Sequence, residues 1–394
     1  MLGDMTDFRL AERMGRLGTE SAFEVLARAK ALEAAGQQII HLEIGEPDFP
    51  TADHISEAAV EALRAGQTHY VPAPGIPALR ESVAAFLERT GRLRTSPDQV
   101  VVTPGAKPIM FFTILALAGP GDEVLYPDPG FPMYASITAF AGATPVPVPL
   151  RESNGFRIDV DELARLITPA SKLLILNSPH NPCGSALTAD DCAAIAALAV
   201  RHDLVVLSDE VYWALRYGDE PHASVLSFDG MADRTILLDG WSKTYAMTGW
   251  RLGFGVFPAA LVEPVTRLAI NSVSCTSAFS QHAAIAALDG PQDGVLAMVA
   301  EFRRRRDVIV AGLNAIDGVS CVEPQGAFYA FPSIAGTGLT ADELAGRLLR
   351  EAGVAALAGT AFGSHGEGFL RISYANSVAN IERALDAIKF LLHS

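Results

Sequence analysis

The stretch KLLILNSP, residues 172–179, decides the fold, because Leu173 to Leu176 form an unbroken apolar run. A run of this kind is typical of a β-strand that is covered on both faces. Further short apolar runs are predicted to be strands as well, at 99–105, 123–129, 204–210 and 235–240.

Longer helical patterns separate several of these runs. They cover 106–117, 131–142 and 188–204, and Thr188 is expected to cap a helix whose first turn is acidic. Repeated alternation of strands and helices predicts an α/β domain with a mostly parallel sheet between helices.

The chain is long enough for two domains, since 394 residues exceed the size at which single cores stop growing. We predict a large domain over 46–290 and a smaller α+β domain built from 1–45 and 291–394. A long helical pattern over 259–315, broken at Gly290–Pro291, is expected to connect them. Two further helices are predicted in the smaller domain, at 340–352 and 377–392.

Composition excludes several classes of protein. The chain is 49% hydrophobic and 19% charged, as in ordinary globular proteins, and its net charge of -15 argues against an extended nucleic-acid surface. The four cysteines form no CxxC pair and the nine histidines are not clustered, so we expect no metal site and no disulfide framework. No signal-peptide pattern or membrane-length apolar run is present, and we therefore expect a cytoplasmic protein.

Unexpected polar residues stand where the predicted strands end. The clusters are GAK (105–107), NSPHNPCG (177–184), DEVY (209–212) and WSK (241–243). Ligands of open parallel sheets bind outside the carboxyl ends of the strands, so we expect the clusters to converge on one site. Each cluster alone also fits an ordinary feature: a tight turn, a proline-stiffened turn, a capping acid or a snorkelling lysine. Likewise, Phe131 alone fits a core aromatic and Arg371 the polar face of a strand.

Together, these residues match what pyridoxal phosphate requires of a protein. A lysine, Lys243, can bond the aldehyde, and an acid, Asp209, can keep the ring nitrogen protonated. Backbone N–H groups at Gly105 and a cation such as Arg251 can hold the phosphate. Other chemistry fits less well, since no dinucleotide fingerprint, P-loop, HExxH or GxSxG motif stands in a suitable context.

The chain resembles the class I/II aminotransferases, pyridoxal-phosphate enzymes of fold type I, in the branch with bacterial aspartate and aromatic aminotransferases. The resemblance extends from about residue 42 to the C-terminus. Its motifs are IGEPDF (44–49), THYVPAPGIPALR (68–80), PGAK (104–107), NSPHNPCG, SDEVY, SKTYAMTGWRLG (242–253), GAFY (326–329) and LRISYANS.

The resemblance implies a role for each matching position. Lys243 and Asp209 are the implied catalytic residues. Implied cofactor contacts are Gly105, Ala106, Lys107 and Arg251 at the phosphate, Phe131 on the ring face, Asn181 and Tyr212 at the phenolic oxygen, and Tyr70 reaching the neighbouring subunit's phosphate. Implied substrate contacts are Gly45, Asn181 and Arg371, which clamps the α-carboxylate. The active unit is then a homodimer, and the implied reaction is ping-pong transamination.

Two positions bear on the details. Gly240 stands where many relatives have a phosphate-binding serine, so Ser242 or the nearby backbone is expected to substitute. Lys107 matches a lysine with which some relatives hold acidic substrates, but an ungapped alignment of the N-terminal arm brings Glu24 near it. A buried Glu24–Lys107 pair would cancel that attraction. We therefore expect a broad or neutral amino donor, with 2-oxoglutarate or pyruvate as acceptor.

Two alternatives remain open at this point. The same fold and lysine serve C–S lyases and related synthases that act on cysteine or methionine derivatives. Aminotransferase-like domains also occur as ligand-sensing parts of transcription regulators, although this chain shows no DNA-binding helices ahead of the domain and is strongly acidic.

Overall fold

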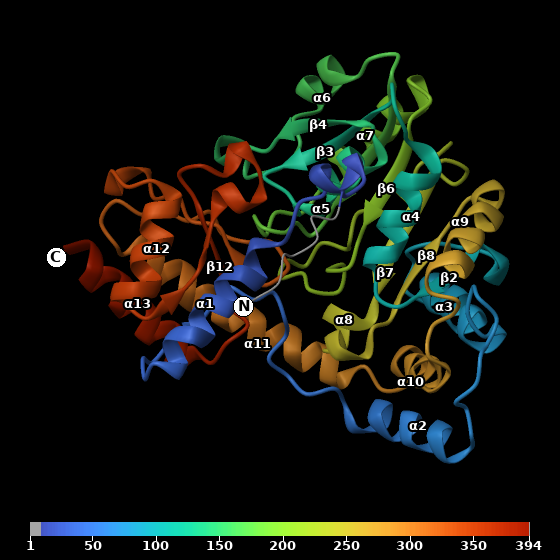
Figure 1. The fold of residues 1–394 in the computed structure, drawn as a ribbon, viewed down its shortest axis with the longest axis horizontal. Coiled ribbons are helices and arrows are strands. Elements are labelled where there is room, and N and C mark those ends of the chain that lie inside the picture. Colours follow the sequence, from blue (N-terminus) through green and yellow to red (C-terminus); the bar gives the residue numbers. More distant parts are fainter. Residues whose placement is uncertain (1–8, 394) are drawn as a thin grey trace.

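A seven-stranded sheet forms the centre of the larger part of the molecule (Figure 1). The structure is a computed structural model that describes residues 9–393. The strand order is β2-β8-β7-β6-β5-β3-β4, and all neighbours are parallel except β8, which runs antiparallel to β2 and β7. The strands are β2 (Val100–Thr103), β3 (Glu123–Asp128), β4 (Thr144–Pro149), β5 (Ser171–Asn177), β6 (Val205–Asp209), β7 (Thr235–Gly240) and β8 (Gly253–Val256). The predicted mostly parallel sheet is confirmed.

Helices cover both faces of this sheet, because the strands are apolar on both sides. One face packs on α4 (Lys107–Leu117), α5 (Met133–Ala141) and α9 (Ala259–Ser272). The other face packs on α3 (Pro77–Arg89), α6 (Val160–Leu166), α7 (Ala189–Arg201) and α10 (Ala278–Asp289), with α2 (Asp53–Arg64) against α10. The expected cap is present, since the Thr188 hydroxyl accepts a hydrogen bond from the backbone N–H of Asp191.

Two strands of the sheet were not predicted. β4 contains Pro145, Pro147 and Pro149, which a central strand could not accommodate, and it lies at the edge of the sheet. β8 contains two glycines in four residues, so its pattern carries little strand signal. Close packing explains one of them, because a Cβ on Gly253 would lie 2.3 Å from the backbone nitrogen of Ala106.

The smaller part joins segments from the two ends of the chain. β1 (Ile40–His41) pairs in parallel with β10 (Val354–Ala355), and β11 (Leu357–Ala358), β12 (Leu370–Ser373) and β9 (Tyr329–Ala330) form an antiparallel sheet. The long helix α11 (Asp293–Asn314) lies between these C-terminal elements and helices α8 (Trp241–Thr244) and α10 (Figure 1). The remaining helices are α1 (Ser21–Ala34), α12 (Ala341–Glu351) and α13 (Val378–His393).

The pairing of β1 with β10 supports our grouping of 1–45 with 291–394, and the division into two domains remains a proposal. The N-terminal segment also contacts the predicted large domain, since the Gly18 N–H donates to Ser136 Oγ of α5 at 2.8 Å. The break at Gly290–Pro291 is present. However, the helical pattern over 259–315 also breaks at 273–277, where Ser274 has a φ of 61° that a helix cannot continue.

Three observations concern the described residues as a group. None of the helices over 9–393 is long and apolar enough to cross a membrane. Within the same range, no group of three or more histidine, cysteine or acidic side chains is placed to hold a metal ion. The four cysteines of the chain, all within this range, are free thiols.

Candidate active site

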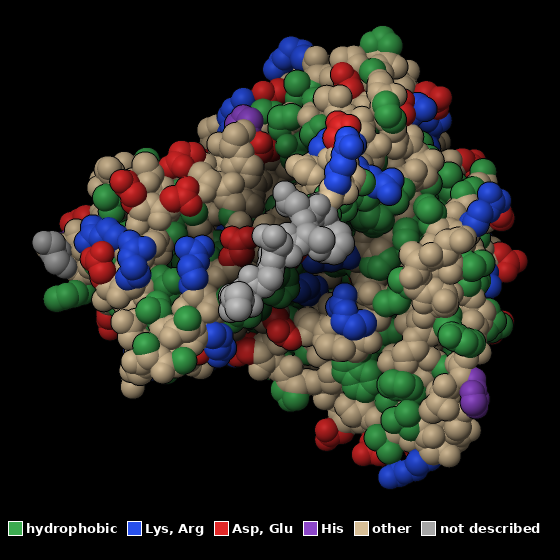
Figure 2. All heavy atoms as spheres, in the orientation of Figure 1, with side chains coloured by type: hydrophobic (Ala, Val, Ile, Leu, Met, Phe, Trp, Pro, Cys, Tyr) green, Lys and Arg blue, Asp and Glu red, His purple; other side chains and the backbone are tan. Residues whose placement is uncertain are grey.

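A cavity of about 620 Å³ opens at the carboxyl ends of β5, β6 and β7. Figure 2 shows this face of the molecule hollowed between its two parts, with basic side chains around the hollow. Ten of the twelve predicted site residues line the cavity: Gly45, Ala106, Lys107, Phe131, Asn181, Asp209, Tyr212, Lys243, Arg251 and Arg371. The clusters at the strand ends therefore converge, as the sequence predicted.

Lys243 lies in the short helix α8, directly after β7. Its ammonium donates a 2.5 Å hydrogen bond to the backbone carbonyl of Gly45. Removal from water lowers the pKa of Lys243 to about 8, and the nearby Arg371 cation acts in the same direction. A lysine in this state can release its proton close to neutral pH, which a catalytic amine needs.

Asp209 lies in the cavity wall at the end of β6, where it is buried. Tyr134 donates a 2.6 Å hydrogen bond to its Oδ2 atom, and the Val211 N–H donates to Oδ1 at 3.3 Å. Burial raises the pKa of Asp209 to about 7, although both hydrogen bonds favour the carboxylate. A partner with positive charge beside Asp209 would therefore be strongly attracted.

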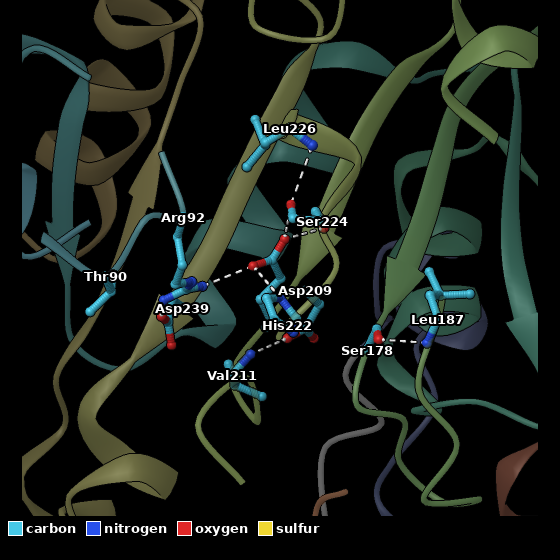
Figure 3. A network of polar contacts seen from close by, with 12 residues as sticks. Thr90, Arg92, Ser178, Leu187, Asp209, Val211, His222, Ser224, Leu226 and Asp239 are labelled. Carbon is cyan, nitrogen blue, oxygen red and sulfur yellow. Dashed lines mark hydrogen bonds and ion pairs between the residues drawn. The ribbon is translucent and has the colours of Figure 1, made fainter. Parts of the chain in front are cut away.

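A network of buried charges stands behind Asp209 (Figure 3). Arg92 binds Glu210 at 2.9 Å and Asp239 at 2.6 Å, so one guanidinium joins the residues that follow Asp209 on β6 and precede Gly240 on β7. Burial would raise the pKa of Glu210, but His222, Arg92 and the Ser224 hydroxyl together hold it well below its usual range. Glu210 is therefore an ionised structural residue.

The N-terminus of α4 and Arg251 form an anion-binding corner of the cavity. The first turn of α4 follows Ala106 and has no side-chain cap. Pro108 has no N–H, and the Ile109 N–H donates to the Ala106 carbonyl. The N–H groups of Ala106 and Lys107 are therefore the ones that can meet an anion.

Gly105 has a φ of +88°, and a Cβ on it would lie 2.1 Å from a terminal nitrogen of Arg251. Only glycine therefore lets the guanidinium approach the turn. Gly105 itself lies beside Arg251 rather than in the cavity wall.

Arg371 on β12 presents a second guanidinium to the cavity. It donates to Asn181 Oδ1 at 3.1 Å and to the carbonyl of Glu43. The central carbon of the guanidinium, Cζ, lies 4.6 Å from the ring centre of Tyr329. Arg371 is 4% exposed, and its Nε atom has no hydrogen-bond partner among residues 9–393. A buried, incompletely paired guanidinium of this kind fits a planar carboxylate.

The other predicted residues complete the cavity walls. Tyr212 and Tyr329 share a 2.8 Å hydrogen bond between their hydroxyls, and Phe131 packs edge-on against Tyr134. Ser242 and Gly240 also line the cavity, and the expected compensation for Gly240 by Ser242 stays a prediction. Tyr70 does not line the cavity of its own chain. It lies at the surface, with 89% of the residue exposed.

The expected pairing of Lys107 with Glu24 is wrong. Lys107 forms an ion pair with Glu20, which stands just before α1. Glu24 lies one turn further along α1, where it is exposed. The ungapped alignment of the arm misplaced the acid by four residues, because no motif before residue 29 fixes the register.

Several residues that shape the site were not predicted. Tyr134, Asn177 and Tyr329 line the cavity, and Arg92 lies in the network behind it. Asn177 accepts a 2.8 Å hydrogen bond from the Asn181 N–H and donates to the carbonyl of Asp209 at 3.1 Å. Asn177 belongs to the motif NSPHNPCG and Tyr329 to GAFY, so their place in these motifs could have indicated a role in the site. Arg92 lies in a charged segment, RTGRLR, and carried no signal of burial.

The cavity as a whole fits an anionic, ring-shaped cofactor. The glycine turn leaves space for Arg251, and Arg251, Asp209 and Arg371 stand in the wall of the same cavity. A reactive lysine stands within the same cavity. These features define a fold type I site for an amino-group transferase.

Comparison with known proteins assigns the family. Residues 37–388 match the family "Aminotransferase class I and II". The chain is 45% identical over 363 residues to an aspartate aminotransferase of Pyrococcus abyssi, covering 91% of this chain and 93% of that one. It is 41% identical over 386 residues to aromatic-amino-acid aminotransferase 2 of Thermococcus litoralis, covering 97% and 98%.

A solved structure supports the same assignment. The aspartate aminotransferase of Rhizobium meliloti superposes with a TM-score of 0.94 at 36% identity, covering 98% of this chain and 99% of that chain. The chain belongs to the class I and II aminotransferase family, and the predicted fold class is confirmed.

Proposed function

We propose that the protein transfers the amino group of an L-amino acid to a 2-oxo acid, with pyridoxal 5′-phosphate as its cofactor. The observation that carries the proposal is the placement of Lys243, Asp209 and Arg371 in the walls of one cavity. They supply an amine of lowered pKa, a buried acid and a carboxylate clamp, which are the groups that amino-group transfer requires.

The cofactor is held at its two ends and on its ring. Arg251 and the N-terminus of α4, with Gly105 and Ala106, hold the phosphate. Asp209 accepts a hydrogen bond from the protonated ring nitrogen, and Tyr134 keeps the Asp209 carboxylate in place. Phe131 covers the ring face, and Asn181 and Tyr212 donate to the phenolic oxygen. When bound, pyridoxal phosphate supplies the aldehyde and the electron sink of the reaction.

Lys243 has two tasks in this proposal. It would hold the cofactor covalently through the aldehyde, and its free amine would take up the proton of the substrate Cα and later give it back. A pKa of about 8 makes the neutral amine accessible near neutral pH. The carbonyl of Gly45 orients Lys243 through the 2.5 Å hydrogen bond.

Arg371 orients the substrate. Its guanidinium binds the α-carboxylate, while Asn181 holds the same guanidinium through the 3.1 Å hydrogen bond. A Cβ on Gly45 would lie 2.0 Å from the hydroxyl of Tyr329, so a glycine at 45 lets the backbone approach the substrate side closely. The donor's α-carbon is thereby presented to Lys243 in a fixed orientation.

The biological unit in this proposal is a cytoplasmic homodimer with 2-oxoglutarate or pyruvate as acceptor. The exposure of Tyr70 supports a dimer, because a tyrosine that contacts the partner subunit's phosphate lies at the surface of its own chain. Lyase or sensor functions gain no support from the relatives, whose names are those of aminotransferases.

A single-turnover experiment tests the proposal. The protein loaded with pyridoxal phosphate is mixed with one L-amino acid at a time, without any 2-oxo acid. We expect one equivalent of the matching 2-oxo acid per active site, together with loss of the cofactor's aldehyde absorption. Continued release of pyruvate or ammonia with the absorption unchanged would instead establish lyase chemistry.

A further inference from the structure

We propose that Glu20 is a specificity-determining residue, whose ion pair with Lys107 selects amino acids with uncharged, apolar side chains over acidic ones. The inference deepens the proposed function and rests on it. Some charged residues of the cavity wall have no role in binding the cofactor or the α-carboxylate. Asp209, Lys243, Arg251 and Arg371 have roles in the proposed function, and the other charged residues in the cavity wall are Glu20, Glu46 and Lys107. The resemblance also placed Lys107 at the phosphate, but its ammonium is paired with Glu20.

Lys107 is the cation that an acidic side chain of the substrate would meet. Its ammonium lies 5.6 Å from the ring centre of Phe131, which in our proposal covers the cofactor. Glu46 does not neutralise it, because Glu46 Oε1 accepts a hydrogen bond from Thr248. Glu20 Oε1 contacts the Lys107 ammonium directly, so the pair has no net charge.

The position of Glu20 makes the pair a feature of the cavity. The side chain of Glu20 is only 16% exposed. Burial lowers the pKa values of Lys243 and Arg371. Glu46 opposes this effect most at Lys243 and Tyr329 most at Arg371, and the Glu20 carboxylate opposes it at both residues. Its charge therefore acts on the reacting side of the cavity, where it would repel a second carboxylate of a substrate.

The N-terminal arm fixes Glu20 in this place. The Gly18 N–H donates to Ser136 Oγ at 2.8 Å, and Arg16 Nε donates to the carbonyl of Ala139 at 2.9 Å. Both acceptors belong to α5, the helix that follows Phe131. The arm is thus anchored two residues before Glu20.

The walls beside the ion pair are apolar. Ile44, Met110, Phe131 and Phe23 line the same cavity, and Phe23 is 60% exposed at its side of the arm. An uncharged aliphatic or aromatic side chain would gain contact with these groups, whereas a carboxylate would have to displace Glu20 from Lys107. The structure thus favours donors such as leucine over aspartate.

Aspartate and leucine provide a matched test, because their side chains have the same shape and differ in charge. We would measure kcat/KM for both donors with the holoenzyme and its Glu20→Gln variant. Wild type should prefer leucine, and Glu20→Gln should raise the aspartate-to-leucine ratio by about tenfold or more, since Lys107 becomes free to bind the carboxylate. Glu24→Gln, the same substitution at the exposed acid one turn away, should change the ratio by less than about twofold.

Adding Lys107→Met to Glu20→Gln tests whether the higher aspartate-to-leucine ratio comes from the freed Lys107 or from a loosened N-terminal segment. The double variant should lose the gain. Binding of succinate and 4-methylpentanoate, measured by calorimetry on the holoenzymes, should show the same change in relative affinity without any turnover.

The inference is contradicted if wild type prefers aspartate, if Glu20→Gln changes both donors equally, or if the gain persists without Lys107. Failure of the proposed function is distinguishable from these results, because wild type would then form no 2-oxo acid from either donor.

Discussion

The phenol of Tyr134 donates a 2.6 Å hydrogen bond to Oδ2 of Asp209, and both groups are buried. The bond favours the ionised carboxylate, so Tyr134→Phe should raise the pKa of Asp209 above its value of about 7. Asp209 must be ionised to hold the ring proton. We therefore expect the acid limb of pyridoxal phosphate binding to the apoprotein to move to higher pH by about one unit.

Titrations of the apoproteins with pyridoxal phosphate over a pH series would measure this shift. Tyr126→Phe is the matched control, since Tyr126 lies on β3, which β5 separates from β6, and it does not line the cavity. Superimposable profiles for wild type and Tyr134→Phe would show that the hydrogen bond does not control Asp209.

Asp209→Asn should stabilise the apoprotein in a pH-dependent way while abolishing transamination. Burial raises the pKa of Asp209 from 3.8 to about 7, so the folded state binds this proton more tightly than the unfolded state does. The wild-type protein therefore loses stability as pH rises through about 7. Between about pH 5 and about pH 8.5, the variant's advantage in free energy of unfolding should grow by about 1–3 kcal/mol. Urea denaturation at the two pH values measures it, and a pH-independent difference would contradict the account.

Arg92→Met should destabilise the protein strongly, because Glu210 and Asp239 would share a buried site without their cation. We expect a loss of about 3–5 kcal/mol in the free energy of unfolding. Adding Asp239→Asn should recover part of that loss. Arg94→Met, two residues away and 90% exposed, should change stability by less than about 0.5 kcal/mol. Equal effects of Arg92→Met and Arg94→Met in denaturant titrations would exclude a structural role for the network.

Gly105→Ala should weaken cofactor binding by about tenfold or more, because the new Cβ would meet the Arg251 guanidinium at 2.1 Å. Gly121→Ala is a matched control. Its φ of +95° imposes a similar backbone strain, but no atom lies within 4 Å of the new Cβ. Equilibrium dialysis of pyridoxal phosphate against the apoproteins compares them, and equal dissociation constants would show that Arg251 does not hold the phosphate.

Much of the fold could be predicted from the sequence because apolar runs and caps are local signals. The buried run around Leu174 and the cap at Thr188 each report their own structure. β4 and β8 could not be predicted, since their prolines and glycines are tolerated only because of their neighbours in the sheet.

The candidate site, too, could be predicted from the sequence only in part. Lys243 and Asp209 stand in dense motifs, so their convergence could be expected from the strand ends. Arg92 is joined to Asp239 across 147 residues, and only tertiary structure brings such groups together. Glu20 was missed because the register of the arm depends on contacts with α5, which leave no periodic pattern in the sequence.

Covalent trapping tests the central claim that Lys243 bonds the cofactor. The protein is incubated with pyridoxal phosphate, reduced with borohydride, digested and analysed by mass spectrometry. We predict the phosphopyridoxyl group on Lys243, and none in the Lys243→Ala variant. A label on Lys107, the other lysine that lines the cavity, or no label at all would contradict the account.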